Sequence, residues 1–308
     1  MQFHILSQAS ITPIQRNLQT CRYSGAVYDA EGHLLINSLR GQKALWKSVD
    51  PDHCPDLTFE TLETPSVYLG HIFDQHGHYL METLTQLALL QYLNPSLAQC
   101  LYFHPFHDSI SENRLADTQQ LATNLLGFTP EIRLCDRPYR CEVLAVAERV
   151  LHINHGISTD DARLVRKAIS NMLGLSAHTP PFRRLFIMPS SRLNRRVDDP
   201  LYCDTAQRFA DWGFELFDPC ALSLFTQAKY FAETACLAGF SGSGLHNVLF
   251  MSPETDLICL GDSRDPHALS VNQAICNGMS AVRCHFVPRA QVQSLHQDWV
   301  ISHTRCGI

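Results

Sequence analysis

The sequence lacks the patterns that mark a zinc-binding or disulfide-stabilised chain. Its 308 residues include twelve cysteines but no Cys-x-x-Cys pair. Their scattered positions fit neither a zinc knuckle nor a small disulfide scaffold. Several lie inside apolar runs, as Cys259 does in "DLICLG". We therefore expect reduced, buried thiols in a cytosolic protein.

Long apolar runs and an export signal are also missing. No segment approaches the ~20 apolar residues that span a bilayer. The start, "MQFHILSQASITPIQRN", has no basic stretch followed by an apolar run. The net charge of -6 gives no reason to expect a nucleic-acid partner. We expect a soluble, cytoplasmic protein whose association with a membrane, if it has one, is peripheral and through partner proteins.

Metal-binding patterns are absent or weak. Asp160-Asp161 begin an expected helix and Asp198-Asp199 precede a proline, so no Asp-x-Asp pair ends a strand convincingly. His76 and His78 form a His-x-His pair without a third ligand nearby, which is weak support for a metal site. The expectation is a protein without a metal or other cofactor.

The pattern that is present from about residue 183 onward is an alternation of short apolar runs with helical periodicity. Strands are expected at 183–189, 214–219, 235–242, 256–262 and 281–289, with helices between them. Alternation of this kind indicates right-handed βαβ units and a parallel sheet. The sequence therefore predicts a Rossmann-like domain in the second half.

The first half is less regular but also of α/β character. Strands are expected at 66–70, 100–105 and 141–154, a hairpin across Ala30-Glu31-Gly32, and helices at 78–93 and about 114–126. A helix over 158–175, capped by Ser158 or Thr159 and ended by Gly174, joins the halves. Because chains of this length usually form two domains, we expect domains at 1–157 and 158–308.

The stretch "AGFSGSGLHNVLF", residues 238–250, follows an expected buried strand with glycines and then a helix. Backbone N–H groups at such a turn point toward one place at a helix N-terminus, and they suit an anion. Ligands of open α/β sheets bind at the carboxyl ends of strands, where Ser241 to Asn247 would lie. The alternative is a tight turn whose glycines only allow close helix packing.

A second signal is the arginine-rich stretch "RRLFIMPSSRLNRR", residues 183–196. Arg192, Arg195 and Arg196 leave the end of an expected strand at the same sheet edge as the glycine turn. Guanidinium groups there could form bidentate bonds to phosphate oxygens. The alternative is a solvated basic loop. Arg183 and Arg184 precede the strand and would lie at its other end.

A third signal is the pair His78 and Glu82 in "DQHGHYLMETL", residues 74–84. On a helix these residues share one side at i and i+4. An imidazole oriented by a carboxylate is a candidate general base near neutral pH. His76 is a second candidate, and the alternative is a helix pair without chemical importance.

Taken in order, these motifs resemble glycosyltransferase family 61, which includes bacterial capsule and surface-polysaccharide enzymes. The resemblance covers roughly residues 68–262. An early family motif is similar to His78, Tyr79, Leu80 and Glu82, and a second is similar to Leu222 through Gln227 with Phe231 and Ala232. The closing motif is similar to Gly239, Ser241, Gly242, Ser243, Gly244, Leu245, His246 and Asn247. Pro189 and Ser241 stand where the family usually carries arginine and histidine.

The resemblance implies a GT-B architecture, in which two Rossmann-like domains face each other across a cleft. It further implies a nucleotide-sugar donor held mainly by the C-terminal domain, an acceptor on the N-terminal side, inversion at the anomeric carbon and no obligatory metal. The expected function is transfer of a sugar to a hydroxyl of a glycan or glycolipid acceptor. His78, Glu82 and His76 are then the candidate catalytic residues. The donor residues are Arg192, Arg195, Arg196, Gln227 and Ser241 to Asn247.

Two other functions stay open at this point. One is a non-catalytic nucleotide-sugar-binding subunit of a polysaccharide assembly complex. The other is a serine hydrolase, because Gly239 to Ser243 almost form a nucleophile elbow around Ser241. The order Ser241, then Asp262 or Asp265, then His267 or His285 matches such enzymes, but only about two expected strands follow the elbow.

Overall fold

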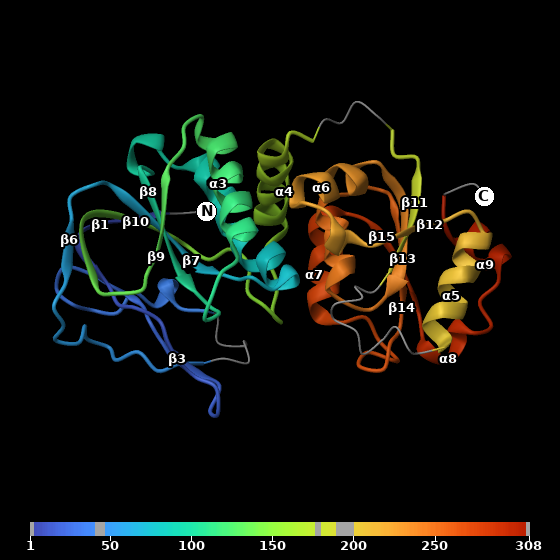
Figure 1. Cartoon of the computed structure of the whole chain (residues 1–308), viewed down its shortest axis with the longest axis horizontal. Helices are drawn as coiled ribbons and strands as arrows, with labels where there is room; N and C mark the ends of the chain where they lie inside the picture. Colours follow the sequence, from blue (N-terminus) through green and yellow to red (C-terminus); the bar gives the residue numbers. More distant parts are fainter. Residues whose placement is uncertain (1–2, 41–46, 176–179, 189–199, 306–308) are drawn as a thin grey trace. The chain divides into compact units, whose positions relative to one another are not determined.

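The computed structural model describes residues 3–40, 47–175, 180–188 and 200–305 (Figure 1). Contacts divide the chain into two compact units, residues 1–172 and 173–308. Both units combine sheets with helices, so the expected α/β class is confirmed.

The second unit is built on a five-stranded, fully parallel sheet in the order β12-β11-β13-β14-β15. Its strands are β11 (Arg183–Ile187), β12 (Glu215–Phe217), β13 (Thr234–Phe240), β14 (Asp256–Leu260) and β15 (Arg283–Val287). Four of these strands fall within runs that the sequence predicts as strands, and β13 begins one residue before the run predicted at 235–242. β13 and β14 are almost wholly buried, as expected for parallel strands covered on both faces.

Helices cover both faces of this sheet (Figure 1). On one face, Phe209, Val292 and Val300 pack with Phe186 and Ile258 of the strands. They belong to or adjoin α5 (Pro200–Asp211), α8 (Arg289–Val292) and α9 (Gln297–His303). The other face carries α6 (Leu224–Ala232), the 3-10 helix η7 (Ser243–Phe250) and α7 (Val271–Ser280).

The strand order places a topological switch between β11 and β13. The chain leaves β11 for β12 on one side and then returns to β13 on the other. In open α/β sheets the crevice for a ligand forms at such a point, beyond the carboxyl ends of the strands. The glycine turn follows β13 directly, so it lies at this edge, as the sequence predicts.

The first unit contains a mixed sheet in the order β4-β1-β10-β7-β8-β9, with β6 also paired to β10. Its strands are β1 (Phe3–Ile11), β4 (Val27–Tyr28), β6 (Glu60–Leu62), β7 (Ser66–Ile72), β8 (Cys100–Pro105), β9 (Glu131–Leu134) and β10 (Tyr139–Ala147). β10, β7, β8 and β9 run parallel, whereas β1 is antiparallel to β10. A small sheet adds β2 (Gln15–Asn17), β3 (Arg22–Ser24) and β5 (Lys47–Ser48).

The helical segment between β7 and β8 is not one regular α-helix. It consists of α1 (His76–His78), the π-helix η2 (Tyr79–Thr83), α2 (Leu84–Leu87) and the 3-10 helix η3 (Ala88–Tyr92). Every residue from 79 to 90 is buried. Protein therefore surrounds residues 79 to 90 of the helix expected at 78–93 on all sides.

Further helical segments of the first unit are η1 (Ile36–Ser38), η4 (Pro95–Leu97) and α3 (Glu112–Leu126), which ends at Gly127 with φ of 77°. α4 (Thr159–Leu173) begins where Ser158 caps it, accepting a hydrogen bond from the amide of Asp161 at 3.1 Å. Hydrogen bonds from Asn124 to the carbonyl of Met172 and from Tyr92 to that of Leu164 attach α4 to the first unit. The contact-based division falls between Met172 and Leu173, the last residue of α4. In the second unit, η6 (Pro219–Ala221) precedes α6.

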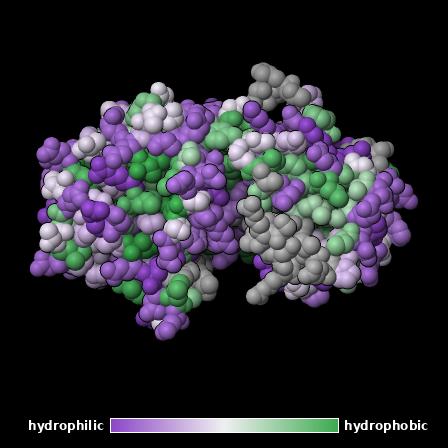
Figure 2. All heavy atoms as spheres, viewed as in Figure 1, coloured by the Kyte–Doolittle hydropathy of each residue, from purple (hydrophilic) through white to green (hydrophobic). Residues whose placement is uncertain are grey.

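Hydrophobic residues on the molecular face shown in Figure 2 are interspersed with hydrophilic ones. The large exposed apolar side chains lie on separate elements, for example Ile5, Ile36 and Leu216. Among the described helices, none has the length and apolarity to cross a membrane. The eleven described cysteines are free thiols. Cys259 is fully buried, and burial raises its pKa.

Candidate active site

The first candidate site lies in the first unit, where β7 leads into the π-helix η2. A π-turn inserts one residue into a helical ladder and is frequent at functional sites. η2 carries Glu82, and His78 immediately precedes it. The predicted i, i+4 pair is present, since Nδ1 of His78 lies 2.7 Å from Oε1 of Glu82.

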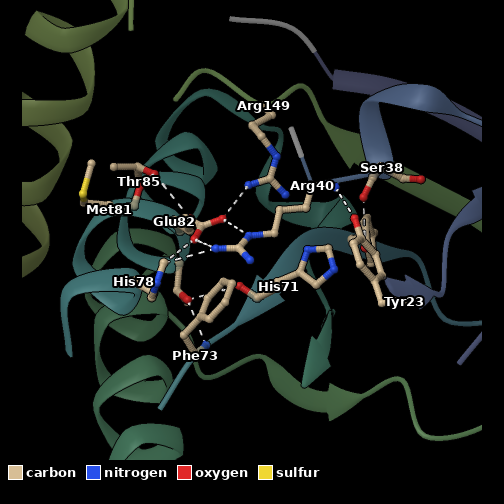
Figure 3. Close-up of polar contacts among 12 residues, drawn as sticks. Tyr23, Ser38, Arg40, His71, Phe73, His78, Met81, Glu82, Thr85 and Arg149 are labelled. Carbon is tan, nitrogen blue, oxygen red and sulfur yellow. Dashed lines mark hydrogen bonds and ion pairs between the residues drawn. The ribbon is translucent and has the colours of Figure 1, made fainter. Parts of the chain in front are cut away.

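Glu82 is the centre of a buried charge cluster (Figure 3). Its carboxylate accepts hydrogen bonds from Nη2 of Arg40 at 2.7 Å and from Nε of Arg40 at 2.8 Å. This is the two-pronged geometry that guanidinium and carboxylate groups favour. Nη1 of Arg149 lies 3.7 Å from the same carboxylate. The side chains of Glu82, Arg40 and Arg149 are only 1%, 4% and 5% exposed, so water hardly screens these charges.

Aromatic rings hold the Arg40 guanidinium in place. Its carbon lies 4.9 Å from the centre of the Phe73 ring and 4.7 Å from that of Phe106, within the range of cation–π attraction. The Phe73 ring also stacks on His78, with centres 5.2 Å apart and planes inclined by 26°. The Phe73 ring therefore aligns both Arg40 and His78, two of the partners of Glu82.

The environment keeps Glu82 ionised. Burial alone would raise its pKa, but the hydrogen bonds from His78 and Arg40 and the charges of Arg40 and Arg149 outweigh burial and lower the pKa to about 2. A carboxylate in this state only accepts hydrogen bonds. Glu82 is thus a hydrogen-bond acceptor that orients the His78 ring.

The ionised carboxylate decides which nitrogen of His78 carries hydrogen. Because Glu82 can only accept, the 2.7 Å contact places the hydrogen of the neutral ring on Nδ1. Nε2 then holds the lone pair. The His78 side chain is 32% exposed, so the ring borders solvent while its Nδ1 side is anchored. This is the arrangement of a histidine that accepts a proton from a substrate.

Arg149 enters the cluster through a bulge in β7. Gly70 has φ of +81°, and a Cβ there would lie 3.2 Å from Nη2 of Arg149. The pairing of β7 with β8 shifts register between Tyr68 and His71. A glycine in a strand is expected where a strand bulges or another group approaches closely. Gly70 meets both conditions.

His71 completes the buried surroundings of the cluster. Neither of its ring nitrogens forms a hydrogen bond with the described residues. Burial lowers the pKa of His71, and the nearby His104, Arg149 and Arg40 lower it further. His71 is therefore a neutral ring.

His76, the second catalytic candidate, is half-buried in α1, two residues before His78. The imidazole contact to Glu82 recorded within the described residues comes from His78. The structure thus joins His78 with Glu82. It does not bring His76 into that pair.

Arg40 and Arg149 were not among the site residues expected from the sequence. Arg40 lies 42 positions from Glu82 along the chain, and nothing in its local pattern marks it. Arg149 carried a readable signal, because it closely follows the apolar strand β10, which runs parallel to β7. Parallel neighbours bring their carboxyl ends to one sheet edge, so a charged residue there could have been placed near the start of η2.

The second candidate site is the glycine turn at the carboxyl end of β13. The amide of Ser241 donates to the carbonyl of Leu260 at 2.7 Å, and the amide of Leu245 donates to Gly242 at 3.0 Å. Within the described residues, the amides of Ser243 and Gly244 form no hydrogen bond. Ser243 is exposed and Gly244 is half-buried. These two amides are therefore unsatisfied donors that packing has not sealed.

The glycines of the turn also serve packing, the alternative that the sequence left open. A Cβ at Gly239 would lie 3.2 Å from Cβ of Ile187, and one at Gly244 would lie 2.9 Å from Cγ2 of Ile187. Both glycines thus let η7 and β13 approach β11. The helix is of 3-10 type rather than the α-helix that its sequence suggested.

The other donor-side residues predicted from the sequence have mainly internal hydrogen bonds. Asn247 is buried and its amide group donates to the carbonyl of Gly244 at 2.9 Å. Gln227 of α6 is buried and donates to the carbonyl of Leu222 at 3.0 Å. Leu245 is buried, whereas His246 is half-buried. Asn247 is thus placed to shape the turn, whereas the side chain of Gln227 bonds to the segment that leads into α6.

Arg192, Arg195, Arg196 and Pro189 lie outside the described residues. A cation that the sequence argument missed is Arg264, whose side chain is 63% exposed. It pairs with the buried Asp262 at 3.3 Å, and its Nη2 lies 3.4 Å from the carbonyl oxygen of Ser241. Arg264 follows β14 and thus brings a guanidinium to the same sheet edge as the glycine turn.

Ser241 does not have the surroundings of a hydrolytic nucleophile. It is only 2% exposed, and its hydroxyl donates to Asp265 at 3.1 Å. His285 instead pairs with Asp256, at the amino end of β14. A nucleophile elbow requires an exposed hydroxyl next to an imidazole, so this geometry does not favour the hydrolase alternative.

Among the described residues, the side chains close enough together to ligate one metal ion are Asp29, Glu31 and His33. They lie on the turn that follows β4, and two of the three are exposed. They form part of neither candidate site.

The family model for glycosyltransferase 61 matches residues 76–258, more than half of the chain. The match begins at His76, two residues before His78, and extends through the glycine turn into β14. A search of curated proteins finds no match. The chain belongs to glycosyltransferase family 61.

Proposed function

We propose that this protein transfers a sugar from a nucleotide-diphosphate sugar to a hydroxyl group of a glycan or glycolipid, with inversion and without a metal. Membership of glycosyltransferase family 61 supports glycosyl transfer. The observation that carries the mechanism is the oriented pair of His78 and Glu82 at 2.7 Å. The proposal includes a GT-B arrangement in which the two units bind acceptor and donor.

The acceptor hydroxyl loses its proton to Nε2 of His78. As that oxygen bonds to the anomeric carbon, the bond from this carbon to the diphosphate oxygen breaks, and the electron pair leaves with the nucleotide diphosphate. Glu82 stabilises the imidazolium that forms. Attack from the side opposite the leaving group inverts the anomeric centre.

The leaving diphosphate gains negative charge. When no metal stabilises this charge, fixed hydrogen-bond donors must do so. The unsatisfied amides of Ser243 and Gly244 suit that role. We assign further contacts to Ser241, Gly242, Leu245, His246, Asn247 and Gln227, and to Arg192, Arg195 and Arg196. Asn247 acts by shaping the turn. Arg264 adds a cation at the same edge.

The acceptor class and the cellular setting belong to the same proposal, which the family resemblance supports. We propose a surface-polysaccharide acceptor in a bacterial cytoplasm, with any membrane association made through partner proteins.

The donor site can be tested at a single backbone amide. Ser243 is the first residue of η7 and Gly242 before it is extended, so proline is tolerated at position 243. Ser243→Pro removes one amide hydrogen, whereas the control Ser243→Ala removes only the hydroxyl. We expect Ser243→Pro to weaken uridine or guanosine diphosphate binding about 10-fold, the cost of one hydrogen bond to a charged group. Isothermal titration calorimetry with and without chelator measures it. Unchanged affinity in Ser243→Pro, or binding lost on chelation, contradicts the proposed donor site.

One observation favours a second candidate, nucleotide-sugar binding without transfer. The hydroxyl of Ser241, a residue that departs from the family motif, is engaged by the carboxylate of Asp265, and a carboxylate repels a diphosphate. Donor binding without turnover on any acceptor would support this candidate.

A further inference from the structure

We propose that Arg40 is a positioning residue of the transfer reaction: its guanidinium fork holds Glu82 so that Nδ1 of His78 must donate and Nε2 is left to accept the acceptor's proton. This inference rests on the proposed function and assigns a role to a residue outside the matched segment 76–258. It is drawn from the contacts in Figure 3.

The contact between the Arg40 guanidinium and the Glu82 carboxylate has two-pronged geometry. Both oxygens of Glu82 bond to Arg40, at 2.7 and 2.8 Å. A carboxylate held at both oxygens cannot rotate, so the oxygen that faces His78 is fixed in position. Without the fork, Glu82 could turn toward Arg149 and release the ring.

The second step is the contact between Arg40 and His78 themselves. Nη2 of Arg40 lies 3.2 Å from Nδ1 of His78. Guanidinium is only a donor, and Nδ1 already donates to Glu82. The contact is therefore not a favourable hydrogen bond but places the positive charge of Arg40 directly against the ring.

The third step is how Arg40 is held. Its backbone amide donates to the hydroxyl of Tyr23 at 2.7 Å, and its guanidinium packs against Phe73 and Phe106. Tyr23 remains protonated at neutral pH, because burial raises its pKa to about 12. These contacts fix the main chain and the charged group of Arg40 independently of Glu82. A pre-set partner of this kind positions a catalytic pair without rearrangement.

Other charged and titratable groups also surround the ring. Glu82 and His76 come from its own helical segment, and Arg149 lies behind Glu82. Asp74 lies in the loop after β7, and His107, which follows β8, lies close enough to feel the charge of His78. Among the described hydrogen-bond and ion-pair contacts to the His78 ring, Arg40 supplies the cation. Replacing Arg40 should therefore change the behaviour of the His78 ring in a way that replacing the other charged groups does not.

The test compares Arg40→Gln, which loses the charge, with Arg40→Lys, which keeps the charge but loses the fork. Both should lower kcat on the order of 100-fold through misplacement of the pair, with little change in donor KM. In Arg40→Gln the acid limb of the pH–rate profile should also move up by about one pH unit, whereas in Arg40→Lys it should stay. Glu82→Gln should move the acid limb of the pH–rate profile to lower pH. Arg133→Gln, in the ion pair with Glu131, is the matched control.

A merely structural role would lower the rate in Arg40→Gln without moving the limb, and that result overturns the inference. Should Arg40→Gln fail to fold, Arg40→Lys carries the test, and a wild-type kcat in Arg40→Lys overturns it. Substrate-free NMR titration of the His78 ring, assigned with His78→Asn, gives a readout that needs no activity. An upward move of its midpoint in Arg40→Gln supports the inference.

The two proposals fail in different ways. If the wild type transfers sugar, His78→Asn does not, and Arg40→Gln leaves both the limb and the NMR midpoint unmoved, the positioning role is wrong and the proposed function stands. If His78→Asn transfers sugar at the wild-type rate, the base itself is misplaced and both proposals fall.

Discussion

At the scale of single residues, the first unit concentrates its unusual chemistry on Glu82. Two guanidinium groups, Arg40 and Arg149, face this one carboxylate. Buried charges of this kind are costly unless they are paired. The cluster therefore makes local stability depend on the ionisation of one residue.

Glu82→Gln should destabilise the protein by about 3 to 5 kcal/mol at neutral pH, because it leaves Arg40 buried without its partner. The folded pKa of Glu82 is about 2, below its ordinary value of 4.5. Its ionised form thus stabilises the folded state fully above pH 4.5, and this contribution is lost as the pH falls toward 2. We expect the difference in Tm between wild type and Glu82→Gln, followed by circular dichroism, to be largest near pH 7.

That difference should shrink as the pH drops below 4.5. Glu131→Gln, in an exposed ion pair with Arg133, is the control and should change Tm little at any pH. A difference in Tm between wild type and Glu82→Gln that stays constant down to pH 3 would show that the ionised carboxylate is not the stabilising species.

At the scale of elements, the bulge in β7 connects backbone conformation to the candidate site. Gly70 and Gly127 have nearly the same φ, +81° and +77°, but a Cβ at Gly127 would meet nothing within 4 Å, whereas one at Gly70 would lie 3.2 Å from Nη2 of Arg149. Substitutions at the two glycines therefore form a matched pair. Comparing them distinguishes the effect of backbone strain from the effect of contact with Arg149.

Alanine at either glycine should cost about 1 to 2 kcal/mol for the left-handed conformation. Only Gly70→Ala should also reduce sugar transfer, because its Cβ displaces Arg149 from Glu82. Thermal unfolding measures the shared strain and an activity assay measures the difference. Equal activity in Gly70→Ala and Gly127→Ala would show that the position of Arg149 does not affect sugar transfer.

Local patterns predicted the elements of the second unit well. Short apolar runs alternating with helical periodicity identified β11 to β15, and the parallel pairing followed from that alternation. The pattern could not distinguish a 3-10 helix from an α-helix at η7, since both begin with the same residues. It also could not show that Gly239 and Gly244 touch Ile187, because that contact depends on the pairing of β13 with β11.

The candidate site of the first unit was only half predictable. The spacing of His78 and Glu82 was readable because it lies within one helical segment. Arg40 was not, since it reaches Glu82 through a loop fixed by Tyr23 and Phe106, both distant in the sequence. The π-turn of η2 likewise depends on burial among neighbours rather than on local residue preference.

At the scale of the whole molecule, each unit carries one half of the proposed reaction. The first unit holds the oriented imidazole, and the second holds open amides at the switch point of a parallel sheet. Membership of glycosyltransferase family 61 is the finding that links them. The proposal therefore predicts that mutations at the imidazole of the first unit impair proton transfer but not donor binding, and that mutations at the amides of the second unit impair donor binding.

The most direct test of that claim is single-turnover sugar transfer by His78→Asn, using the radiolabelled nucleotide sugar that gives the largest thermal shift. The account predicts that donor Kd is unchanged while the rate of transfer falls by about 100-fold or more, the usual contribution of a general base. Transfer by His78→Asn at the wild-type rate would contradict it.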